Sequence, residues 1–550
     1  MPFADLINKL ITDSTMSLPL FSPELAIVIT IVALLLSRLC NTERFVSGSS
    51  LALIGTLCGL ILAGLLSWQV LVMGGDSSVP IFTGLLVYDS FTGFFRLFLL
   101  LFLTCVILLT KISGIPDRDD APDFYTLLLG STLGMMLMAS ANHLLIVFLG
   151  VEMTSVPSYA MVGFLKGRRQ SSEAALKYVV YGAGAAGVML YGISLLSGTL
   201  GTAHLPAMAS ALKAFGDSLG ITGSGVGDLA ILFKHPACRT LALSLLMILV
   251  GIAFKLSVFP FHFWCPDAFE GASAEVGGFL SVASKGAAFA VLIRLCQALV
   301  GSSPSSSAVL STLYLHVGVG LGVAAAFTAT FGNLAAYTQT NIKRMLAYST
   351  IAHAGYMLMA VAALMVILNG GAPGVTASAR ASAAQFCVRG LLYYLSVYFF
   401  MNLGAFAIVA LVRNQIFSEK IADYAGLAKQ APLLAVCLLV CLFSLIGLPP
   451  FGGFIGKFMI FASLFDAGQY HTAMYAVLVI GGLNTVFSLF YYLRVAKAMF
   501  LEDWGHEALP LQVAPRDGWF AFALSAPVLL LGIVVEPLSA VALNVAKSLF

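Results

Sequence analysis

Charge is what this chain has least of. Only 10% of its 550 residues are Asp, Glu, Lys or Arg, whereas soluble domains carry about 25% charged residues. Hydrophobic residues make up 60% of the sequence. A soluble globular protein is therefore excluded. The formal net charge of +3 is dispersed along the chain and does not indicate a nucleic-acid partner.

Motifs of catalytic chemistry are also missing. The nine cysteines are scattered and form no CxxC pair, so neither a disulfide framework nor a cysteine-held metal or iron–sulfur site is predicted. There is no P-loop, HExxH, nucleophile elbow or haem motif. GAGAAG at 182–187 matches GxGxxG, but it lies in an apolar stretch with no preceding strand, which favours close helix packing. We expect no redox centre and no cofactor in this chain.

Long apolar stretches are what the chain has in abundance. A membrane-spanning helix needs roughly 20 apolar residues, and we expect an all-α polytopic membrane protein with about fourteen transmembrane helices. Residues 1–20 lack a basic segment followed by an apolar core, so no cleavable signal peptide is predicted. The expected spans are 22–39, 50–73, 85–109, 124–140, 142–165, 173–198, 240–260, 275–299, 309–337, 343–368, 386–412, 432–465, 471–498 and 519–546.

Basic residues follow alternate spans. Lys111 comes after span 3, Lys166 after span 5, Lys343 after span 9 and Lys420 after span 11, while the loops after spans 2, 4, 8 and 12 have no Lys or Arg. Because cytoplasmic loops carry the excess of basic residues, we expect the odd-numbered loops to be cytoplasmic and both termini to lie outside. The loop after span 7 is an exception, since it is acidic at Asp267.

Proline and glycine interrupt two spans in comparable ways. Span 7 reads GIAFKLSVFPFHFW, with Lys255 just before Pro260, and span 12 reads SLIGLPPFGGFIGKF, which ends at Lys457 and Phe458. The breaks lie five spans apart, which predicts two inverted five-helix repeats with broken helices 7 and 12, a pattern typical of transport sites. The alternative is that Pro and Gly are simply common in membrane helices. The expected division is 1–122 (helices 1–3), 123–308 (helices 4–8), 309–500 (helices 9–13) and 501–550 (helix 14).

Five ionisable residues lie inside these spans: Glu152, Lys177, Lys255, Lys285 and Lys457. A charged side chain at the bilayer centre costs about 2.5–3.5 kcal/mol even on the insertion scale, so we interpret them as a path for protons or cations. Spans 5 and 6 form an antiparallel hairpin, and we expect Lys177 to reach Glu152 in a pair that opens and closes. The alternative for Lys177 is that its ammonium extends to the membrane surface.

Two histidines, and a pair of opposite charges in span 3, also lie in or next to the apolar spans. His262 and His353 can relay protons between the lysines, and a packing or hydrogen-bonding role is the alternative. Asp89 and Arg96 are seven residues apart on one face of span 3, which favours a structural ion pair or a partner contact over transport.

Five segments of the sequence resemble segments of a known protein family, and they occur in the same order. The family is that of the antiporter-like membrane subunits of complex I, the proton-pumping NADH:quinone oxidoreductase. Within that family the chain is most similar to subunit N, because it has a lysine at 457 where subunits M and L carry a carboxylate, ends span 13 with FYYLRVAKAMF, and has no long lateral helix after span 14. The segments are LGVEMTSVPSY, SSEAALKYVVYGA, FKLSVFPFHFWCPDAFEGA, NIKRMLAYSTIAHAGYML and GLPPFGGFIGKF.

The resemblance implies a role for each ionisable residue. Glu152 and Lys177 would couple to the neighbouring subunit, Lys255 would be the central lysine on the input side, Lys285 a middle relay, and Lys457 the terminal lysine that exchanges a proton with one side of the membrane. The chain departs from the family in the loop after span 7, which reads GAS where GAP is usual.

The resemblance also implies a setting. The chain would lie in the bacterial plasma (inner) membrane and contact the lipid bilayer, an M-like antiporter subunit and the small K-like and J-like subunits. NADH, flavin, iron–sulfur clusters and quinone would bind to other subunits. The alternatives are a subunit of a multisubunit sodium/proton antiporter, the membrane arm of a related hydrogenase or dehydrogenase, and a passive scaffold. The buried lysines argue against a scaffold, because a scaffold has no use for groups that cost so much to insert.

Overall fold

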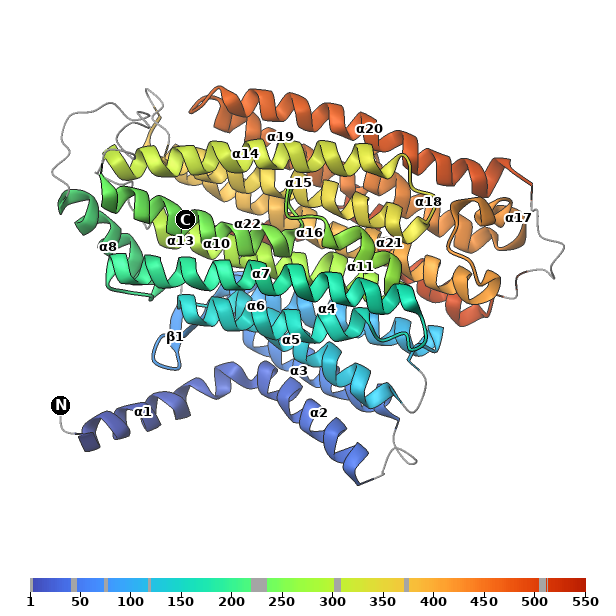
Figure 1. Ribbon diagram of the computed structural model, residues 1–550, viewed down its shortest axis with the longest axis horizontal. Coiled ribbons are helices and arrows are strands. Elements are labelled where there is room, and N and C mark those ends of the chain that lie inside the picture. Colours follow the sequence, from blue (N-terminus) through green and yellow to red (C-terminus); the bar gives the residue numbers. More distant parts are fainter. Residues whose placement is uncertain are drawn as a thin grey trace.

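The molecule is a bundle of helices that run side by side along its long axis (Figure 1). The computed structural model describes residues 3–40, 47–73, 78–116, 120–218, 235–300, 308–369, 375–503, 511 and 513–550. The first half of the chain contains α1 (Phe3–Ser17), a 3-10 turn η1 (Pro19–Phe21), α2 (Ser22–Leu39), α3 (Gly48–Met73), β1 (Val79–Ile81), β2 (Leu86–Tyr88), α4 (Ser90–Ser113), α5 (Ala121–Ser140), α6 (Leu144–Val162), α7 (Arg169–Leu200), α8 (Leu205–Ser218), α10 (Pro236–Leu256) and α11 (Trp264–Gly271).

The second half is also helical. It contains α12 (Ala274–Phe279), the π-helical turn η4 (Leu280–Ser284), α13 (Lys285–Val300), α14 (Ala308–Ala336), α15 (Ile342–Asn369), α16 (Ala377–Ile416), the 3-10 turn η5 (Ile421–Tyr424), α17 (Leu427–Gln430), α18 (Pro432–Ile446), α19 (Gly452–Gly468), α20 (Ala473–Leu501), α21 (Pro515–Ile533) and α22 (Glu536–Lys547).

Twelve helical segments in the described ranges are long and apolar enough to cross a membrane, which confirms the predicted all-α polytopic membrane class. The predicted number of fourteen is not confirmed by this count. It leaves out α5, and the span expected at 432–465 is divided into the shorter helices α18 and α19. The two inverted repeats and the domain boundaries at 122, 308 and 500 stay predictions.

Several elements were not predicted. They include the N-terminal helix α1, the hairpin of β1 and β2, α8 in the long loop after α7, and the short turns η5 and α17 before α18. The two strands pair antiparallel, with Val79 opposite Tyr88. The hairpin explains why the span expected to begin at 85 begins at Ser90: the chain is extended up to Asp89, whose carboxylate caps the helix by accepting from the Thr92 amide at 2.8 Å. In Figure 1, α1 and α2 diverge from the rest of the bundle.

Both predicted helix breaks are present. The first lies between α10 and α11, where Ser257 ends α10 with a φ of 58°. The second lies between α18 and α19, where Gly447 ends α18 with a φ of 90°. Left-handed backbone suits glycine because it has no Cβ. A Cβ at Gly447 would also lie 3.1 Å from Cδ of Lys457, so glycine leaves room for that lysine.

A third irregularity was not predicted. α12 continues into α13 through the π-helical turn η4, which ends directly before Lys285. A π turn holds one residue more than the regular helix, so it rotates the side chains that follow it. Such turns often mark functional positions in helices.

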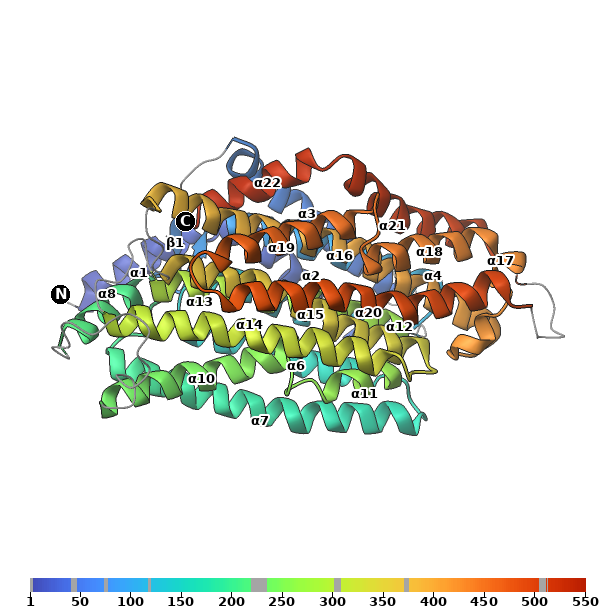
Figure 2. The same ribbon diagram turned by 90° about the horizontal axis from the view of Figure 1, so that it is seen from above.

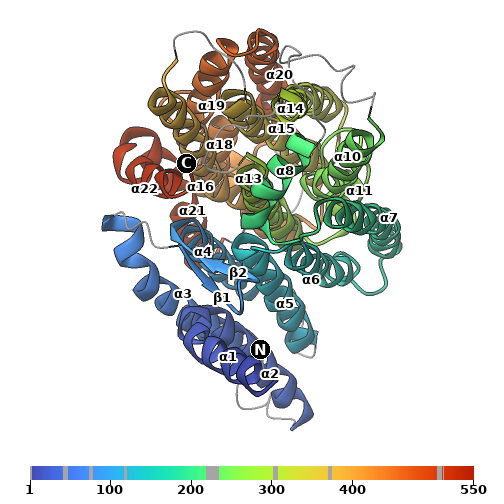
Figure 3. The same ribbon diagram turned by 90° about the vertical axis from the view of Figure 1, so that its left-hand side faces the viewer.

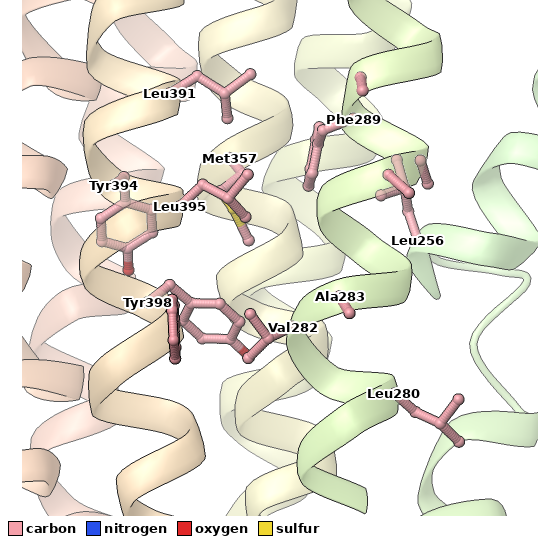
Figure 4. Close-up of a cluster of buried hydrophobic side chains, with 14 of the residues drawn as sticks. Leu256, Leu280, Val282, Ala283, Phe289, Met357, Leu391, Tyr394, Leu395 and Tyr398 are labelled. Carbon is pink, nitrogen blue, oxygen red and sulfur yellow. The ribbon is translucent and has the colours of Figure 1, made fainter. Parts of the chain in front are cut away.

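The core is formed by three of these segments: α12 to α13, α15 and α16. Viewed end-on they lie inside the bundle (Figure 3), while α7 and α22 lie on opposite sides of it (Figure 2). Apolar side chains from η4 and α13, such as Val282 and Phe289, face Leu395 and Tyr398 of α16 in the buried cluster of Figure 4. Of the predicted lysines, Lys285 lies on these core segments, whereas Lys255 lies on α10, which contacts α13, and Lys457 lies on α19, which contacts α15.

Asp89 and Arg96 do not pair with each other as the spacing suggested. Both are buried, and each binds a residue that is far away in the chain. Arg294 donates to both carboxylate oxygens of Asp89, at 2.6 and 2.7 Å, and Arg96 donates to Glu24 at 2.7 Å. Burial raises the pKa of Asp89, but the charge and hydrogen bonds of Arg294 outweigh it and hold that pKa below its usual value. These pairs join the N-terminal helices to the core.

Candidate functional site

Lys255 lies at the end of α10, directly before the first helix break. Its side chain is 1% exposed, and its ammonium donates to the hydroxyl of Ser155 on α6 at 2.9 Å. Glu152 lies one turn earlier on α6, and its charge acts on Lys255. One carboxylate oxygen of Glu152, Oε1, is buried and has no hydrogen-bond partner within the described ranges. α6 therefore presents a hydroxyl and a carboxylate to the first buried lysine.

Lys177 does not meet Glu152, so that expectation was wrong. Its ammonium lies 2.8 Å from Glu173, one turn earlier on α7, and 2.8 Å from Asp267 on α11. Arg344 of α15 binds the other oxygen of Asp267 at 2.7 Å. The side chain of Lys177 is 41% exposed, so it lies on the outside of the bundle and is not enclosed by it. Adjacency of spans 5 and 6 in the sequence did not decide the pairing, because one carboxylate, Glu173, comes from α7 itself and the other, Asp267, comes from α11.

Lys285 follows the π-helical turn and is fully buried. Its ammonium donates to the backbone carbonyl of Thr350 on α15 at 3.2 Å. Thr350, His353 and Tyr356 are spaced three residues apart, so they lie on one face of α15. That face leads from Lys285 toward Lys457.

His353 lies between the two lysines on this face of α15. Its Nδ1 is 2.5 Å from the hydroxyl of Tyr394 on α16, and its Nε2 is 3.3 Å from the hydroxyl of Tyr492 on α20. The charges of Lys285 and Lys457 both act on it. A buried imidazole with a hydroxyl at each ring nitrogen can accept a proton on one side and donate one on the other.

Lys457 lies one turn into α19, just after the second break. Its ammonium donates to the carbonyls of Leu445 and Ile446, which end α18, at 3.0 and 2.9 Å. It also lies 4.5 Å from the ring centroid of Tyr356 on α15. The break therefore supplies the acceptors: a helix end leaves carbonyls without helical partners, and the lysine binds two of them.

His262 does not join this path. It lies in the first break, where its ring stacks against Phe259 and packs against Phe331 and Phe263. Its Nδ1 has no hydrogen-bond partner in the part of the chain that the structure describes. These contacts favour the packing alternative for His262.

Lys255, Lys285 and Lys457 share one property. Each is at most 2% exposed, and each donates only to neutral oxygens: a hydroxyl or backbone carbonyls. No ion pair within the described ranges involves any of the three. A lysine held in this way can exist with or without its proton, because no carboxylate has to be neutralised when the proton leaves.

The sequence did not predict the burial of several charged residues. Arg294 lies in an apolar span, so the rule that found the lysines could have found it. Glu275 lies at the start of span 8 and is 1% exposed. In the sequence Lys343 looks like a loop residue that sets the orientation, yet it is 1% exposed and lies 2.9 Å from Glu419. Nothing in the sequence indicated that Tyr394 and Tyr492 contact His353, because a tyrosine in an apolar helix looks like an ordinary core residue.

The GAGAAG segment lies inside α7 and not at a strand–helix turn, as expected. Only part of it packs closely: a Cβ at Gly182 would lie 2.0 Å from the hydroxyl of Tyr159, whereas Gly184 and Gly187 have no such neighbour within 4 Å. No group of three or more His, Cys, Asp or Glu side chains that could hold a metal ion occurs in the described residues.

Comparisons with known proteins agree with this architecture. The family described as "NADH:quinone oxidoreductase/Mrp antiporter, TM" matches residues 141–484. The NADH-quinone oxidoreductase subunit N of Anaeromyxobacter sp. (strain Fw109-5) is 37% identical over 534 residues, which are 94% of each chain. The NADH-quinone oxidoreductase subunit N 2 of Sorangium cellulosum is 37% identical over 531 residues, which are 96% of each chain.

Two solved structures share the fold. A chain of respiratory complex I from Thermus thermophilus with bound aureothin superposes with a TM-score of 0.67 at 28% identity, covering 94% of this chain and 98% of that one. A chain of the archaeal membrane-bound sulfane sulfur reductase superposes with a TM-score of 0.77 at 19% identity, covering 97% and 98%, and indicates the fold alone.

Proposed function

The chain belongs to the NADH:quinone oxidoreductase/Mrp antiporter transmembrane family, and from this premise we propose that it is the subunit N of a NADH:quinone oxidoreductase and translocates protons. It carries no redox chemistry of its own. NADH, flavin, iron–sulfur clusters and quinone bind to other subunits, and quinone reduction there drives the protons here. The observation that carries the proposal is the row of three buried lysines that donate only to neutral oxygens.

The proton moves along the central helices in short steps. Lys255 takes it up beside Glu152, Lys285 receives it on the core helix α13, and His353 passes it to Lys457. Lys457 then exchanges it with one side of the membrane. The steps between the lysines need water or hydroxyl groups, because lysine side chains on different helices do not touch.

The carboxylate of Glu152 can drive the first step. At an effective dielectric constant of about 20, a unit charge at 4 Å contributes about 4 kcal/mol, and this halves when the distance doubles. Since about 1.4 kcal/mol is a tenfold change in an equilibrium, a movement of a few ångströms is enough to hold or release a proton at Lys255. Because Oε1 of Glu152 has no hydrogen-bond partner among the described residues, no bond at that oxygen has to break for the carboxylate to move.

The setting follows from the same proposal. The protein lies in the bacterial inner membrane with its odd-numbered loops in the cytoplasm and both termini outside. Its partners are an M-like antiporter subunit and the small K-like and J-like subunits. The relatives named above are subunits of multisubunit enzymes, which supports such an assembly.

The test is a lysine variant in the intact complex. We would purify the complex with Lys255→Ala, reconstitute it in liposomes and follow NADH-driven proton uptake together with quinone reduction. Both rates should fall by on the order of tenfold or more, because a positioned proton-transfer group contributes at least that much. Lys497→Ala is the matched control: Lys497 is 65% exposed at the end of α20, and its loss should change neither rate.

Two results would overturn the proposal. If the Lys255→Ala complex assembles and pumps at the normal rate, these lysines are not the path. If proton movement occurs only with sodium present and does not depend on NADH, the chain belongs to a sodium/proton antiporter instead.

A further inference from the structure

Glu275 is a buried carboxylate to which the path described so far gives no role. It lies in the first turn of α12, which Ser273 caps, and it is 1% exposed. Neither of its carboxylate oxygens has a hydrogen-bond partner among the residues that the structure describes. The other deeply buried carboxylates, Glu24 and Asp89, each bind an arginine. Glu275 therefore differs from them in having no partner that fixes it.

An unpartnered carboxylate is costly in the interior of a protein. A buried polar group without hydrogen bonds costs several kcal/mol, and an isolated ionised carboxylate costs more. The cost is relieved when the carboxyl carries a proton, when water reaches it, or when a positive charge lies nearby. The two structural carboxylates each accept from an arginine: Asp89 at both oxygens from Arg294, and Glu24 at one oxygen from Arg96. The environment of Glu275 instead suits a group that binds and releases a proton.

Polar atoms continue from Glu275 toward Lys285. Ser281, in the π-helical turn, accepts a hydrogen bond of 2.5 Å from the amide of Asn402 on α16. The carbonyl oxygen of Asn402 and the hydroxyl of Ser284 are buried without partners in the described structure. Ten residues separate Glu275 from Lys285, which is about 15 Å along a helix, and these side chains lie between them. Unsatisfied polar atoms in a row are the usual surroundings of buried water.

In the direction away from Lys285, polar and charged groups connect Glu275 with the surface of the bundle. Its charge acts on Lys343 of α15 and on Tyr125 of α5. Lys343 lies 2.9 Å from Glu419, which is 16% exposed. The hydroxyl of Tyr125 lies 3.0 Å from that of Thr110, near the end of α4. Polar groups therefore extend from Glu275 to the end of the bundle that holds the basic loops.

We infer that Glu275 is the carboxyl that loads Lys285 with protons from that end of the bundle. The inference rests on the proposed function, and it adds a site to it. In the loading step, the carboxyl O–H bond of Glu275 breaks and its proton passes through water and the hydroxyls near Ser281 to the neutral amine of Lys285. The carboxylate left behind takes up a new proton from the side of Lys343 and Glu419. Lys285 thus has its own supply and does not depend on Lys255 alone.

The test uses the intact complex in liposomes, with NADH-driven proton uptake and quinone reduction as the readouts. Glu275→Gln keeps the shape but cannot carry a proton, so both rates should fall by on the order of tenfold while the yield of assembled complex is unchanged. Glu275→Asp keeps the carboxyl and should restore at least about half of the rate, which a role in packing alone would not explain. Glu24→Gln is the control, because it makes the same change at a buried carboxylate outside the path. Loss of its ion pair with Arg96 should lower stability, but the complex that assembles should pump at the normal rate.

A second variant tests the inference if the Glu275→Gln complex does not assemble. Asn402→Leu is nearly isosteric and removes the polar atoms next to Ser281, so it should slow proton uptake in an assembled complex. If Glu275→Gln assembles and pumps normally, the inference is wrong. If Glu275→Gln does not assemble, normal proton uptake by the Asn402→Leu complex overturns the inference instead. Lys255→Ala, measured beside them, separates the two proposals: if it is impaired while these variants pump normally, only the role of Glu275 is lost.

Discussion

The ammonium of Lys177 lies 2.8 Å from the carboxylate of Asp267, on a helix that follows the first break. Arg344 binds the other oxygen of the same carboxylate at 2.7 Å, and it also binds Glu270 at 2.6 Å. The half-helix α11 is thus joined to α7 on one side and to α15 on the other. A shift of α11 would break all three ion pairs, so these contacts connect the first break to the central helix α15.

A double-mutant cycle can measure this connection. Lys177→Met and Asp267→Asn each remove one side of the same contact, so their effects on proton uptake should be non-additive, with a coupling of at least about 0.5 kcal/mol. Lys177→Met and Glu152→Gln remove groups that are not in contact and should be additive. Coupling of Lys177 to Glu152 instead of Asp267 would contradict the arrangement described here.

The hydroxyl of Ser155 should support proton transfer at Lys255. It is the acceptor for the ammonium of Lys255, and a hydrogen bond to a charged group contributes about 1.5–3 kcal/mol. Ser155→Ala should therefore lower the rate of proton uptake by about tenfold. Ser158→Ala, one turn later on α6, is the control, since the Ser158 hydroxyl donates to the backbone carbonyl of Thr154. Equal rates for the two variants would argue against a role for Ser155.

Two neighbouring tyrosines on α16 allow a test of the histidine relay. The hydroxyl of Tyr394 lies 2.5 Å from Nδ1 of His353, whereas the hydroxyl of Tyr393 donates to the backbone carbonyl of Leu531. Tyr394→Phe should slow proton uptake several-fold, because His353 loses one proton partner. Tyr393→Phe should reduce thermal stability slightly and leave the rate of uptake unchanged. If both variants pump normally, His353 has a packing role.

Gly532 keeps the second break in place. A Cβ on Gly532 of α21 would lie 1.9 Å from the carbonyl oxygen of Pro450, so Gly532→Ala must displace the backbone between α18 and α19. Overpacking of this kind costs about 1–3 kcal/mol, and it should also lower pumping by moving Lys457. Gly482→Ala is the control, because a Cβ there meets nothing within 4 Å and alanine favours helix by up to about 1 kcal/mol. Melting temperature and proton uptake of the two complexes check both expectations.

The sequence predicted the features that depend on single residue types. Proline and glycine marked both breaks, and a lysine in an apolar stretch marked each of the buried positions at 255, 285 and 457. Pairing was harder to predict, because the partner often comes from a distant part of the chain. Spacing alone placed Asp89 and Arg96 on one face, but it could not indicate that their partners are Arg294 and Glu24.

Positions that look ordinary in sequence were also missed. The tyrosines around His353 have the composition of a core, and only their arrangement gives them proton partners. Glu275 follows a short loop and precedes two glycines, which does not indicate that both of its oxygens are buried without donors. The hairpin of β1 and β2 is too short for an alternating pattern to be recognised.

The π-helical turn before Lys285 has a consequence for how this segment can be altered. Each residue of a regular helix turns the chain by about 100°, so deleting one residue from 280–284 would make the helix regular and rotate all of α13 by that angle relative to α12. The ammonium of Lys285 would then point away from Thr350, although no side chain had been exchanged. The position of this lysine therefore depends on the number of residues before it, which a scan of point substitutions would never reveal and a single-residue deletion would.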